Sequence, residues 1–345
     1  MTTSEQGLLR QALVTGQEVL GSTALGGAIV DSAGRVETEA VGRTHENGEP
    51  VSDADQWHIG SCFKAINALV VARLVERGTL EWSTPIAELF SDLAEGMAAG
   101  WEQPTVAELL TCQSGMRANP TVRELLAGFK DERPPTEQRT ELTMKALATP
   151  PKNHGKFLYS NVGYTVVGAA IDRLVGKPFE EVLDEEVLTP LEIRSAGWGP
   201  PPHIRGHGPK VQLGSLMLGR GKAADPDDPR SDNPTLINPA GRLHLTLGDW
   251  AKIHHVFLAE GAGLVEPSSV ERMLAIPDGN FMSMGWSGGR GIPRVHRAMQ
   301  GSNGRWVATA LMSEDRSRTV MVIANDGRTR TLRRAPAVTA TLLAE

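Results

Sequence analysis

The order of hydrophobic periods along this chain constrains its fold more than any other feature. Alternating, strand-like segments lie toward both ends, at residues 26–41 and 281–324, whereas the long middle of the 345-residue chain reads mostly as helices. Strands at the two ends form one sheet only if the ends meet. We therefore predict an α/β (α+β) fold in which helices flank an antiparallel sheet built from both chain ends, with an inserted, mostly helical subdomain.

Caps, turns and periodicity predict the individual elements. Strands are predicted at residues 26–30, 36–41, 281–286, 293–299, 305–312 and 318–324, and helices at residues 7–20, 61–77, 162–175, 178–188, 246–259 and 333–344. A capping box at residues 105–108 opens a further helix, and the polar, proline-rich stretch 221–234 is predicted to be a loop. The predicted α/β subdomain comprises residues 1–57 and 281–345, and the mostly helical subdomain comprises residues 58–280; together they form one functional unit.

Composition and charge exclude several classes of function. The chain carries 35 Lys and Arg against 41 Asp and Glu, a net charge of −6, so neither nucleic acid nor a membrane is an expected partner. Two cysteines, Cys62 and Cys112, lack the spacing of a metal site, and no nucleotide-binding fingerprint is present, so no metal or cofactor is predicted. The N-terminal residues lack the pattern of a secretory signal, which predicts a cytoplasmic protein. Nothing in the sequence indicates the oligomeric state.

The strongest chemical signal is the stretch Ser61-Cys62-Phe63-Lys64 at the start of a predicted helix. Residues three positions apart lie on one face of a helix, so the Ser61 hydroxyl and the Lys64 amine are predicted to lie side by side. A serine hydroxyl is a poor nucleophile near neutral pH, and an adjacent amine is a base that can activate it. The alternatives are a plain helix cap for Ser61 and a solvated first-turn residue for Lys64.

Two further motifs accompany this pair. Tyr159-Ser160-Asn161 precedes a predicted helix, and Gly301-Ser302-Asn303-Gly304 lies between two predicted strands. Together with residues 106–116, 189–191 and 239–243, these motifs resemble the serine β-lactamase and penicillin-binding superfamily, in particular its class C β-lactamase-like branch of esterases and transacylases. The resemblance covers roughly residues 20–330 in the expected order, and it implies a fold of the β-lactamase and transpeptidase type.

The resemblance also implies a role for each motif. Ser61 would attack an acyl carbon and carry the acyl group, Lys64 and Tyr159 would move the proton, and Asn161 would hold Lys64 and a substrate carbonyl. For Tyr159 the alternative is a core tyrosine, and for Asn161 it is a helix cap.

The motif Gly301-Ser302-Asn303-Gly304, here called the late motif, supplies the rest of the predicted site. The backbone N–H groups of Ser61 and Ser302, the latter next to Gly301, would form the oxyanion hole and bind substrate. Trp286, Met299, Arg305 and Trp306 are candidates for the pocket lining, and core packing is the default alternative for the two tryptophans.

One departure from the family pattern narrows the predicted substrate. The late strand of this family usually reads Lys-Thr-Gly or His-x-Gly, whereas the corresponding residues here are Met299, Gln300 and Gly301. A thioether supplies neither the charge nor the hydrogen bond of those side chains. We therefore predict a serine hydrolase or acyltransferase that acts on a small-molecule ester or amide through a covalent Ser61 acyl-enzyme, rather than a β-lactamase or peptidoglycan peptidase.

Two other readings of the function stay open. In an ATP-independent transacylase of antibiotic biosynthesis, an amine or alcohol would replace water as the acceptor of the acyl group. A catalytically weak or inactive pseudo-hydrolase would only bind a ligand. Two decoys carry less weight. After the Gly-x-Ser-x-Gly pattern at residues 285–289, an α/β-hydrolase needs an acid and then a histidine, but His296 is the last histidine and precedes Asp315 and Asp326. The adjacent His254 and His255 do not share a helix face.

Overall fold

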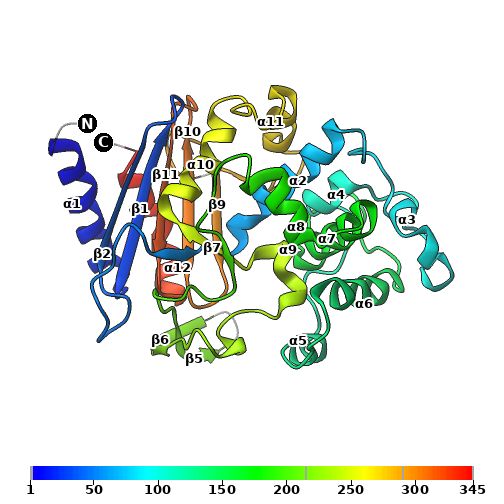
Figure 1. Cartoon of the computed structure of the whole chain (residues 1–345), viewed down its shortest axis with the longest axis horizontal. Helices are drawn as coiled ribbons and strands as arrows, with labels where there is room; N and C mark the ends of the chain where they lie inside the picture. The colour runs from blue at the N-terminus through cyan, green and yellow to red at the C-terminus, as the bar shows by residue number, and fades with distance from the viewer. Residues whose placement is uncertain (1–2, 214–215, 290, 344–345) are drawn as a thin grey trace.

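A six-stranded antiparallel sheet occupies one side of the molecule, and most of the helices lie on the other side (Figure 1). The computed structural model describes residues 3–213, 216–289 and 291–343. The strands of the large sheet are β1 (Ala24–Asp31), β2 (Val36–Gly42), β8 (Ser287–Gly288), β9 (Val295–Ser302), β10 (Val307–Ser313) and β11 (Arg318–Ala324), in the order β2-β1-β11-β10-β9-β8. Because β1 pairs with β11, with Gly27 opposite Val322, the two chain ends meet inside the sheet, and the predicted fold class is confirmed.

The alternation of side chains along the strands separates two apolar cores. Val307 and Leu311 of β10 belong to the core that includes helices α1 (Thr3–Leu20) and α12 (Thr329–Thr341). Ala308 and Ala310, which point to the opposite face, belong to the larger core that includes the helical half. Each face of the sheet is thus buried by its own set of helices, which fixes the strand register.

The remaining elements connect and surround the cleft described below. The other helices are α2 (Phe63–Glu76), α3 (Ile86–Leu89), α4 (Val106–Leu110), α5 (Val122–Gly128), α6 (Pro135–Leu147), α7 (Asn161–Val175), α8 (Phe179–Leu183), α9 (Asn238–Gly241), α10 (Leu247–Leu258) and α11 (Pro267–Leu274). Short helical turns are η1 (Gly60–Cys62), η2 (Ser91–Gly96), η3 (Asp184–Leu188), η4 (Pro229–Ser231) and η5 (Thr235–Ile237). Two small sheets contain β3 (Gln56–His58), β7 (Leu243–Thr246) and β4 (Gly197–Trp198), and β5 (His207–Leu213) with β6 (Leu216–Ala223).

Several predicted elements differ from the structure. No strand covers residues 281–286; the chain there turns at Gly285, whose φ of +91° is not extended, and β8 is confined to the next residues. The hairpin of β5 and β6 was not predicted, and it includes residues 221–223 of the predicted loop. Helix α12 begins four residues earlier than predicted, and residue 344 of that prediction lies outside the described residues. The predicted subdomain boundaries stay a prediction.

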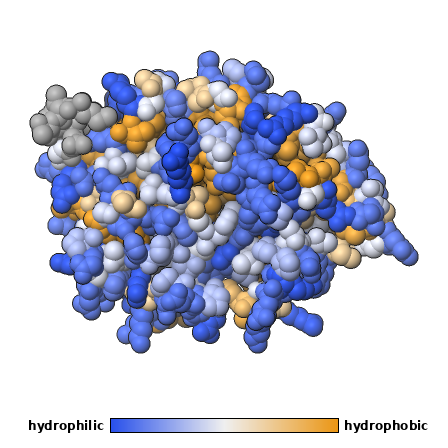
Figure 2. Space-filling model, viewed as in Figure 1, coloured by the Kyte–Doolittle hydropathy of each residue, from blue (hydrophilic) through white to orange (hydrophobic). Residues whose placement is uncertain are grey.

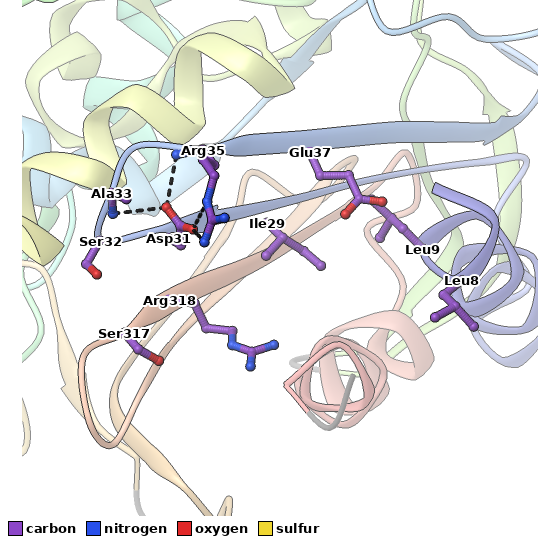
Figure 3. Close-up of a pocket in the computed structure, with 10 residues that line it drawn as sticks. All are labelled: Leu8, Leu9, Ile29, Asp31, Ser32, Ala33, Arg35, Glu37, Ser317 and Arg318. Carbon is purple, nitrogen blue, oxygen red and sulfur yellow. Dashed lines mark hydrogen bonds and ion pairs between the residues drawn. The ribbon is translucent and has the colours of Figure 1, made fainter. Parts of the chain in front are cut away.

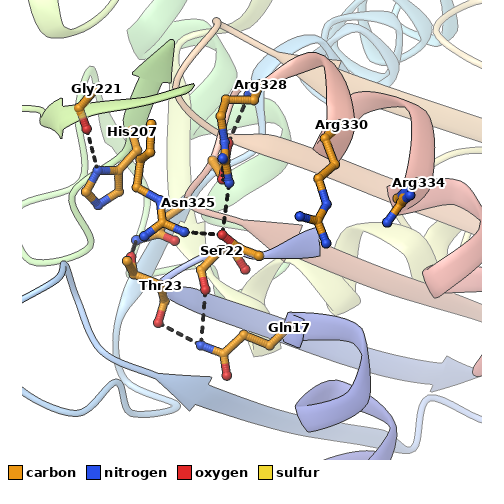
Figure 4. Close-up of polar contacts among 12 residues, drawn as sticks. Gln17, Ser22, Thr23, His207, Gly221, Asn325, Arg328, Arg330 and Arg334 are labelled. Atoms are coloured by element: carbon orange, nitrogen blue, oxygen red, sulfur yellow. Dashed lines mark hydrogen bonds and ion pairs between the residues drawn. The ribbon is translucent and has the colours of Figure 1, made fainter. Parts of the chain in front are cut away.

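The two chain ends are also joined by arginine side chains at the carboxyl end of α1 (Figure 4). Arg328 donates to the Gly21 carbonyl at 2.9 Å, and Arg330 donates to the Val19 carbonyl at 2.7 Å. Arg220 also donates to the Gly21 carbonyl. Cations at this end of a helix satisfy its free carbonyls and oppose its dipole, a contribution of about 0.3–1 kcal/mol each.

Candidate active site

Ser61 lies in the helical turn η1, directly against the end of strand β9. This approach requires glycine on both sides: a Cβ atom at Gly60 would lie 2.6 Å from the Ser302 nitrogen, and one at Gly301 would lie 2.2 Å from the Ile59 oxygen. Gly60 also has a φ of +53°, which glycine adopts without strain. The glycines therefore allow the backbone N–H groups of Ser61 and Ser302 to lie close together.

Lys64 is fully buried one turn further along, on α2. Its Nζ atom lies 3.3 Å from Ser61 Oγ, 2.7 Å from Asn161 Oδ1 and 2.6 Å from the Ala240 carbonyl oxygen. These three acceptors use all three N–H donors of an ammonium group. The serine and the lysine therefore lie side by side, as the spacing predicts.

Two tyrosine rings enclose the same nitrogen. Lys64 Nζ lies 4.9 Å from the ring centroid of Tyr159 and 5.1 Å from that of Tyr164. Burial raises the pKa of Tyr164 well above its usual value, and its hydroxyl donates to the Leu110 carbonyl at 2.6 Å, so this phenol stays protonated. Tyr159 is half-buried, and among the described residues its hydroxyl makes no hydrogen bond to Ser61 or Lys64. In this structure the ring of Tyr159, rather than its oxygen, meets the amine.

Asn161 is free to face Lys64 because Ser160 caps α7. The Ser160 hydroxyl accepts from the Gly163 N–H at 2.8 Å, which removes the need for Asn161 to act as the cap. Asn161 Nδ2 in turn donates to Asn119 Oδ1 at 2.7 Å. Nothing in the sequence pattern singles out Asn119; the nearest motif, residues 106–116, ends three residues before it.

These groups open onto a cleft of about 100 Å³. It is lined by Ser61, Asn119, Pro120, Leu125, Asn161, Asn233, Ile237, Ala240, Gly241 and Ser302. The cleft thus brings together Ser61, Asn161 and Ser302 of the predicted site.

The predicted pocket lining lies elsewhere. Trp286, Met299 and Trp306 are buried in the core: Met299 lies in β9, and the two tryptophans, which lie just outside β8 and β10, pack against other aromatic rings. Trp286 packs edge-on against His254 and Phe257. Arg305 donates to the Arg230 carbonyl and is not among the residues that line the cleft.

A wider groove of about 500 Å³ lies on the outer side of the sheet, between α1 and the ends of β1 and β11 (Figure 3). Its one aspartate, Asp31, already accepts hydrogen bonds from the backbone of Ala33 and from Arg35. The groove shares no lining residue with the Ser61 cleft. Ser61, Asn161 and Ser302 of the predicted site therefore line the smaller cleft and not this groove.

The surface and the described side chains give little support for a metal site or a membrane-spanning helix. Figure 2 shows a face on which hydrophilic residues predominate and apolar residues form separate patches. Among the described residues, no group of three or more His, Cys, Asp or Glu side chains could hold a metal ion. In the same part of the chain, every helix is too short or too polar to cross a membrane.

Comparison with known proteins agrees with this geometry. The Beta-lactamase family model matches residues 17–343. The chain belongs to the beta-lactamase family. The serine β-lactamase and penicillin-binding superfamily, which the motifs indicate, is thereby confirmed.

Relatives within this superfamily carry different names. Penicillin-binding protein 4 of Amycolatopsis lactamdurans is 24% identical over 257 residues, which cover 70% of this chain and 64% of that protein. Esterase EstB of Burkholderia gladioli is 28% identical over 161 residues, which cover 44% of this chain and 41% of that protein. The chain therefore spans less than two thirds of the length of these curated relatives. The solved D-amino acid amidase of Ochrobactrum anthropi SV3, in complex with L-phenylalanine amide, has a TM-score of 0.76 at 18% identity over 99% of this chain and 98% of that one, a likeness of fold.

This member of the beta-lactamase family also contains a buried histidine and aspartate directly behind Ser61. His58 Nε2 lies 2.9 Å from Asp232 Oδ2, and both side chains are fully buried. The pair looks like two thirds of a Ser-His-Asp triad. However, His58 Nδ1 accepts from the Gly60 N–H at 3.0 Å, so neither ring nitrogen is free to serve Ser61. Sequence analysis assigned no role to either residue.

Proposed function

We propose that this protein is a serine acyl-transfer enzyme that acts through a covalent Ser61 acyl-enzyme on a small-molecule ester or amide. The observation that carries the proposal is the 3.3 Å contact between Ser61 Oγ and a fully buried Lys64 Nζ. A nucleophile within hydrogen-bond reach of a base that is itself oriented by other groups is the arrangement that activates a serine.

The hydrogen bonds of Lys64 support its role as the base. Asn161 Oδ1 and the Ala240 carbonyl oxygen can only accept hydrogen bonds, and the Asn161 amide is oriented by its donation to Asn119. A neutral amine has two N–H groups and one lone pair. When the two N–H groups serve these two acceptors, the lone pair faces Ser61 Oγ, where the proton must be removed.

The first half of the reaction then needs only groups in the cleft. Ser61 Oγ attacks the acyl carbon while its proton passes to Lys64 Nζ, and the backbone N–H groups of Ser61 and Ser302 bind the oxyanion that forms. The two tyrosine rings and three acceptors around Nζ stabilise the resulting ammonium. Collapse of the intermediate forms the Ser61 ester and expels the leaving group, which takes a proton from Lys64 directly or through Tyr159.

Substrate size and class follow from the cleft. A volume of about 100 Å³, lined by three asparagines and the apolar Leu125 and Ile237, suits a small acyl group better than a drug-sized one. The names of its relatives, esterase and D-amino acid amidase, belong to enzymes of ester and amide chemistry. Met299 is buried and cannot hold a substrate carboxylate, so we do not propose β-lactam hydrolysis as the main activity.

Covalent labelling tests the proposal. A fluorophosphonate should add its mass to Ser61 in one-to-one stoichiometry, and Ser61→Ala should abolish the addition. Ser302→Ala is the matched control: its hydroxyl only accepts from the Gly304 N–H, and the variant keeps the backbone donor, so labelling should persist. An unlabelled wild-type protein would favour the binding pseudo-hydrolase.

The acceptor of the acyl group stays a separate question. Water would make the protein an esterase or amidase, and an amine or alcohol would make it a transacylase. Aminolysis that outpaces hydrolysis when amines are added to an acyl donor would support the transacylase. Product ratios that do not depend on the amine would exclude it. The cytoplasmic location stays a prediction that cell fractionation tests.

A further inference from the structure

The two backbone segments of the proposed oxyanion hole share one buried carboxylate. Asp232, which lies between η4 and η5, has a fully buried side chain. One oxygen, Oδ2, faces His58 Nε2 at 2.9 Å, and the other, Oδ1, accepts from Asn303 Nδ2 at 2.8 Å. His58 binds the residue before Ser61, and Asn303 follows Ser302. Each oxygen of Asp232 is thus one side chain away from one oxyanion donor.

We infer that Asp232 is a positioning residue that sets the separation of the Ser61 and Ser302 N–H groups through His58 and Asn303. This inference rests on the proposed function, because it assigns a role within the oxyanion hole of the Ser61 acyl-enzyme. Asp232 does not line the cleft and touches no reacting atom. Asp232 acts through two side chains, His58 and Asn303, which we call its relays, on the backbone N–H groups of Ser61 and Ser302.

The His58 relay has only one consistent protonation pattern. Because the Gly60 N–H donates to His58 Nδ1, that nitrogen has a lone pair and the ring proton lies on Nε2, facing Asp232. The ring also stacks on Trp306, with centroids 5.3 Å apart, so it cannot turn freely. Asp232 therefore fixes the ring that fixes the Gly60 amide, next to Ser61.

The Asn303 relay is equally constrained. Its Oδ1 accepts from the Arg305 N–H at 3.0 Å and the Trp306 N–H at 3.2 Å, so its Nδ2 must face Asp232. Reversing the amide would place its N–H groups against two backbone donors. Asn303 thereby closes the turn after Ser302 around the same carboxylate.

Only a carboxylate can serve both relays. Asp232 also accepts from the Asn233 N–H at 2.7 Å, and Arg242 Nε lies 3.5 Å from Oδ2, so these two neighbours, like His58 and Asn303, are donors. Burial alone would raise the pKa of Asp232, but His58, Arg242 and Asn303 outweigh it and hold the pKa below its usual value. In Asp232→Asn, two of these four donors would face an amide N–H instead of an oxygen, whichever way the amide lies.

Asp232→Asn tests the inference, with Asp249→Asn as the matched control. Asp249 is also buried, and its carboxylate accepts from the Ser195 hydroxyl and N–H and pairs with Lys252, away from the cleft. On an activated ester, we expect Asp232→Asn to lower kcat about 10–100-fold with KM within threefold, because one oxyanion donor is worth about 10²–10³ in rate and the amides are displaced rather than lost. Asp249→Asn should change neither constant more than twofold. Loss of stability with unchanged kcat would overturn the inference.

Two spectroscopic readouts separate positioning from folding. The infrared carbonyl band of the acyl-enzyme should move to higher frequency in Asp232→Asn, since weaker oxyanion bonds polarise the carbonyl less, and should not move in Asp249→Asn. Amide hydrogen exchange in the unacylated protein should accelerate at both residues 60–62 and residues 302–304 in Asp232→Asn alone. Unchanged exchange at either segment would overturn the inference even if Ser61 proved unreactive, so the two proposals can fail independently.

Asn303→Ala provides a second test of the inference in case Asp232→Asn does not fold. It removes one relay and leaves the carboxylate bound to His58. We expect kcat to fall about tenfold and exchange to accelerate at residues 302–304 only. Wild-type kcat and exchange in this variant would refute the role of the shared carboxylate.

Discussion

The contact between β9 and η1 can be tested by adding a single methyl group. In Gly301→Ala the new Cβ would lie 2.2 Å from the Ile59 oxygen, 2.6 Å from the Ser61 nitrogen and 2.7 Å from the Cys62 nitrogen. All three atoms belong to the backbone, so no side chain can swing aside. Ordinary contact begins at 3.4 Å, and the strand and the turn must therefore separate by about 1 Å.

This separation acts directly on the proposed oxyanion hole. A misplacement of 1 Å costs about 10² in rate, and loss of one oxyanion donor costs about 10²–10³. We expect kcat/KM for an activated ester to fall by about 10²–10³, equivalent to about 2.7–4 kcal/mol of transition-state stabilisation. The free energy of unfolding should fall by about 1–3 kcal/mol, the usual cost of overpacking.

The assay compares steady-state kinetics and urea unfolding for wild type, Gly301→Ala and Gly248→Ala. Gly248 lies in α10 with open space around its Cβ position, so its alanine variant should keep full activity and gain up to about 1 kcal/mol of stability. A Gly301→Ala protein that keeps kcat/KM within threefold of wild type would refute the argument that close backbone approach sets the oxyanion hole.

Three further predictions concern the base, the buried histidines and the late motif. Lys64→Ala should slow fluorophosphonate labelling of Ser61 by about 10²–10⁴, whereas exposed Lys252→Ala should not; equal rates would remove Lys64 as the base. Burial lowers the pKa of His244 to about 4 and that of His254 to about 3. Below pH 6.5 the unfolded chain therefore binds protons that the folded protein does not bind. Stability should be full above pH 6.5 and should fall, by roughly 1.4 kcal/mol per pH unit for each histidine, as the pH drops toward 4. Urea unfolding at pH 7 and pH 5 measures this loss, and His254→Leu should reduce it; identical midpoints for wild type at both pH values would contradict the assignment. Wild type should hydrolyse a chromogenic cephalosporin slowly and Met299→His faster; efficient wild-type turnover would refute the argument from the missing cation.

Local patterns predicted the parts of this structure that depend on neighbouring residues. The capping box at Thr105 and Glu108 is present, and Thr246 caps α10 as expected. The five long strands of the large sheet followed from apolar and alternating runs, and the serine–lysine contact followed from helical spacing. The order of strands, helices and strands predicted a sheet built from both chain ends, but not which strands pair.

The missed features depend on contacts between distant segments. Asp232 lies in a polar, proline-rich loop, and nothing local distinguishes it from the aspartates that precede it. Its partners, His58 and Asn303, are 174 and 71 residues away. Trp286 and Trp306 were predicted at the cleft, but aromatic side chains occur in both pockets and cores. Only the packing of the sheet on its helices determines which of these two locations they occupy.

The pairing of β1 with β11 has a consequence for folding during synthesis on the ribosome. During synthesis the N-terminal hairpin leaves the ribosome about 280 residues before its neighbouring strand, since the hairpin ends with β2 at Gly42 and β11 ends at Ala324. Until then the edge of β1 is unpaired and open to aggregation, and chaperones are expected to recognise it. For the same period Ser61 lacks the backbone N–H of Ser302, so on the proposed mechanism a nascent or prematurely terminated chain has an incomplete oxyanion hole, and catalysis is expected to begin only when translation is nearly complete.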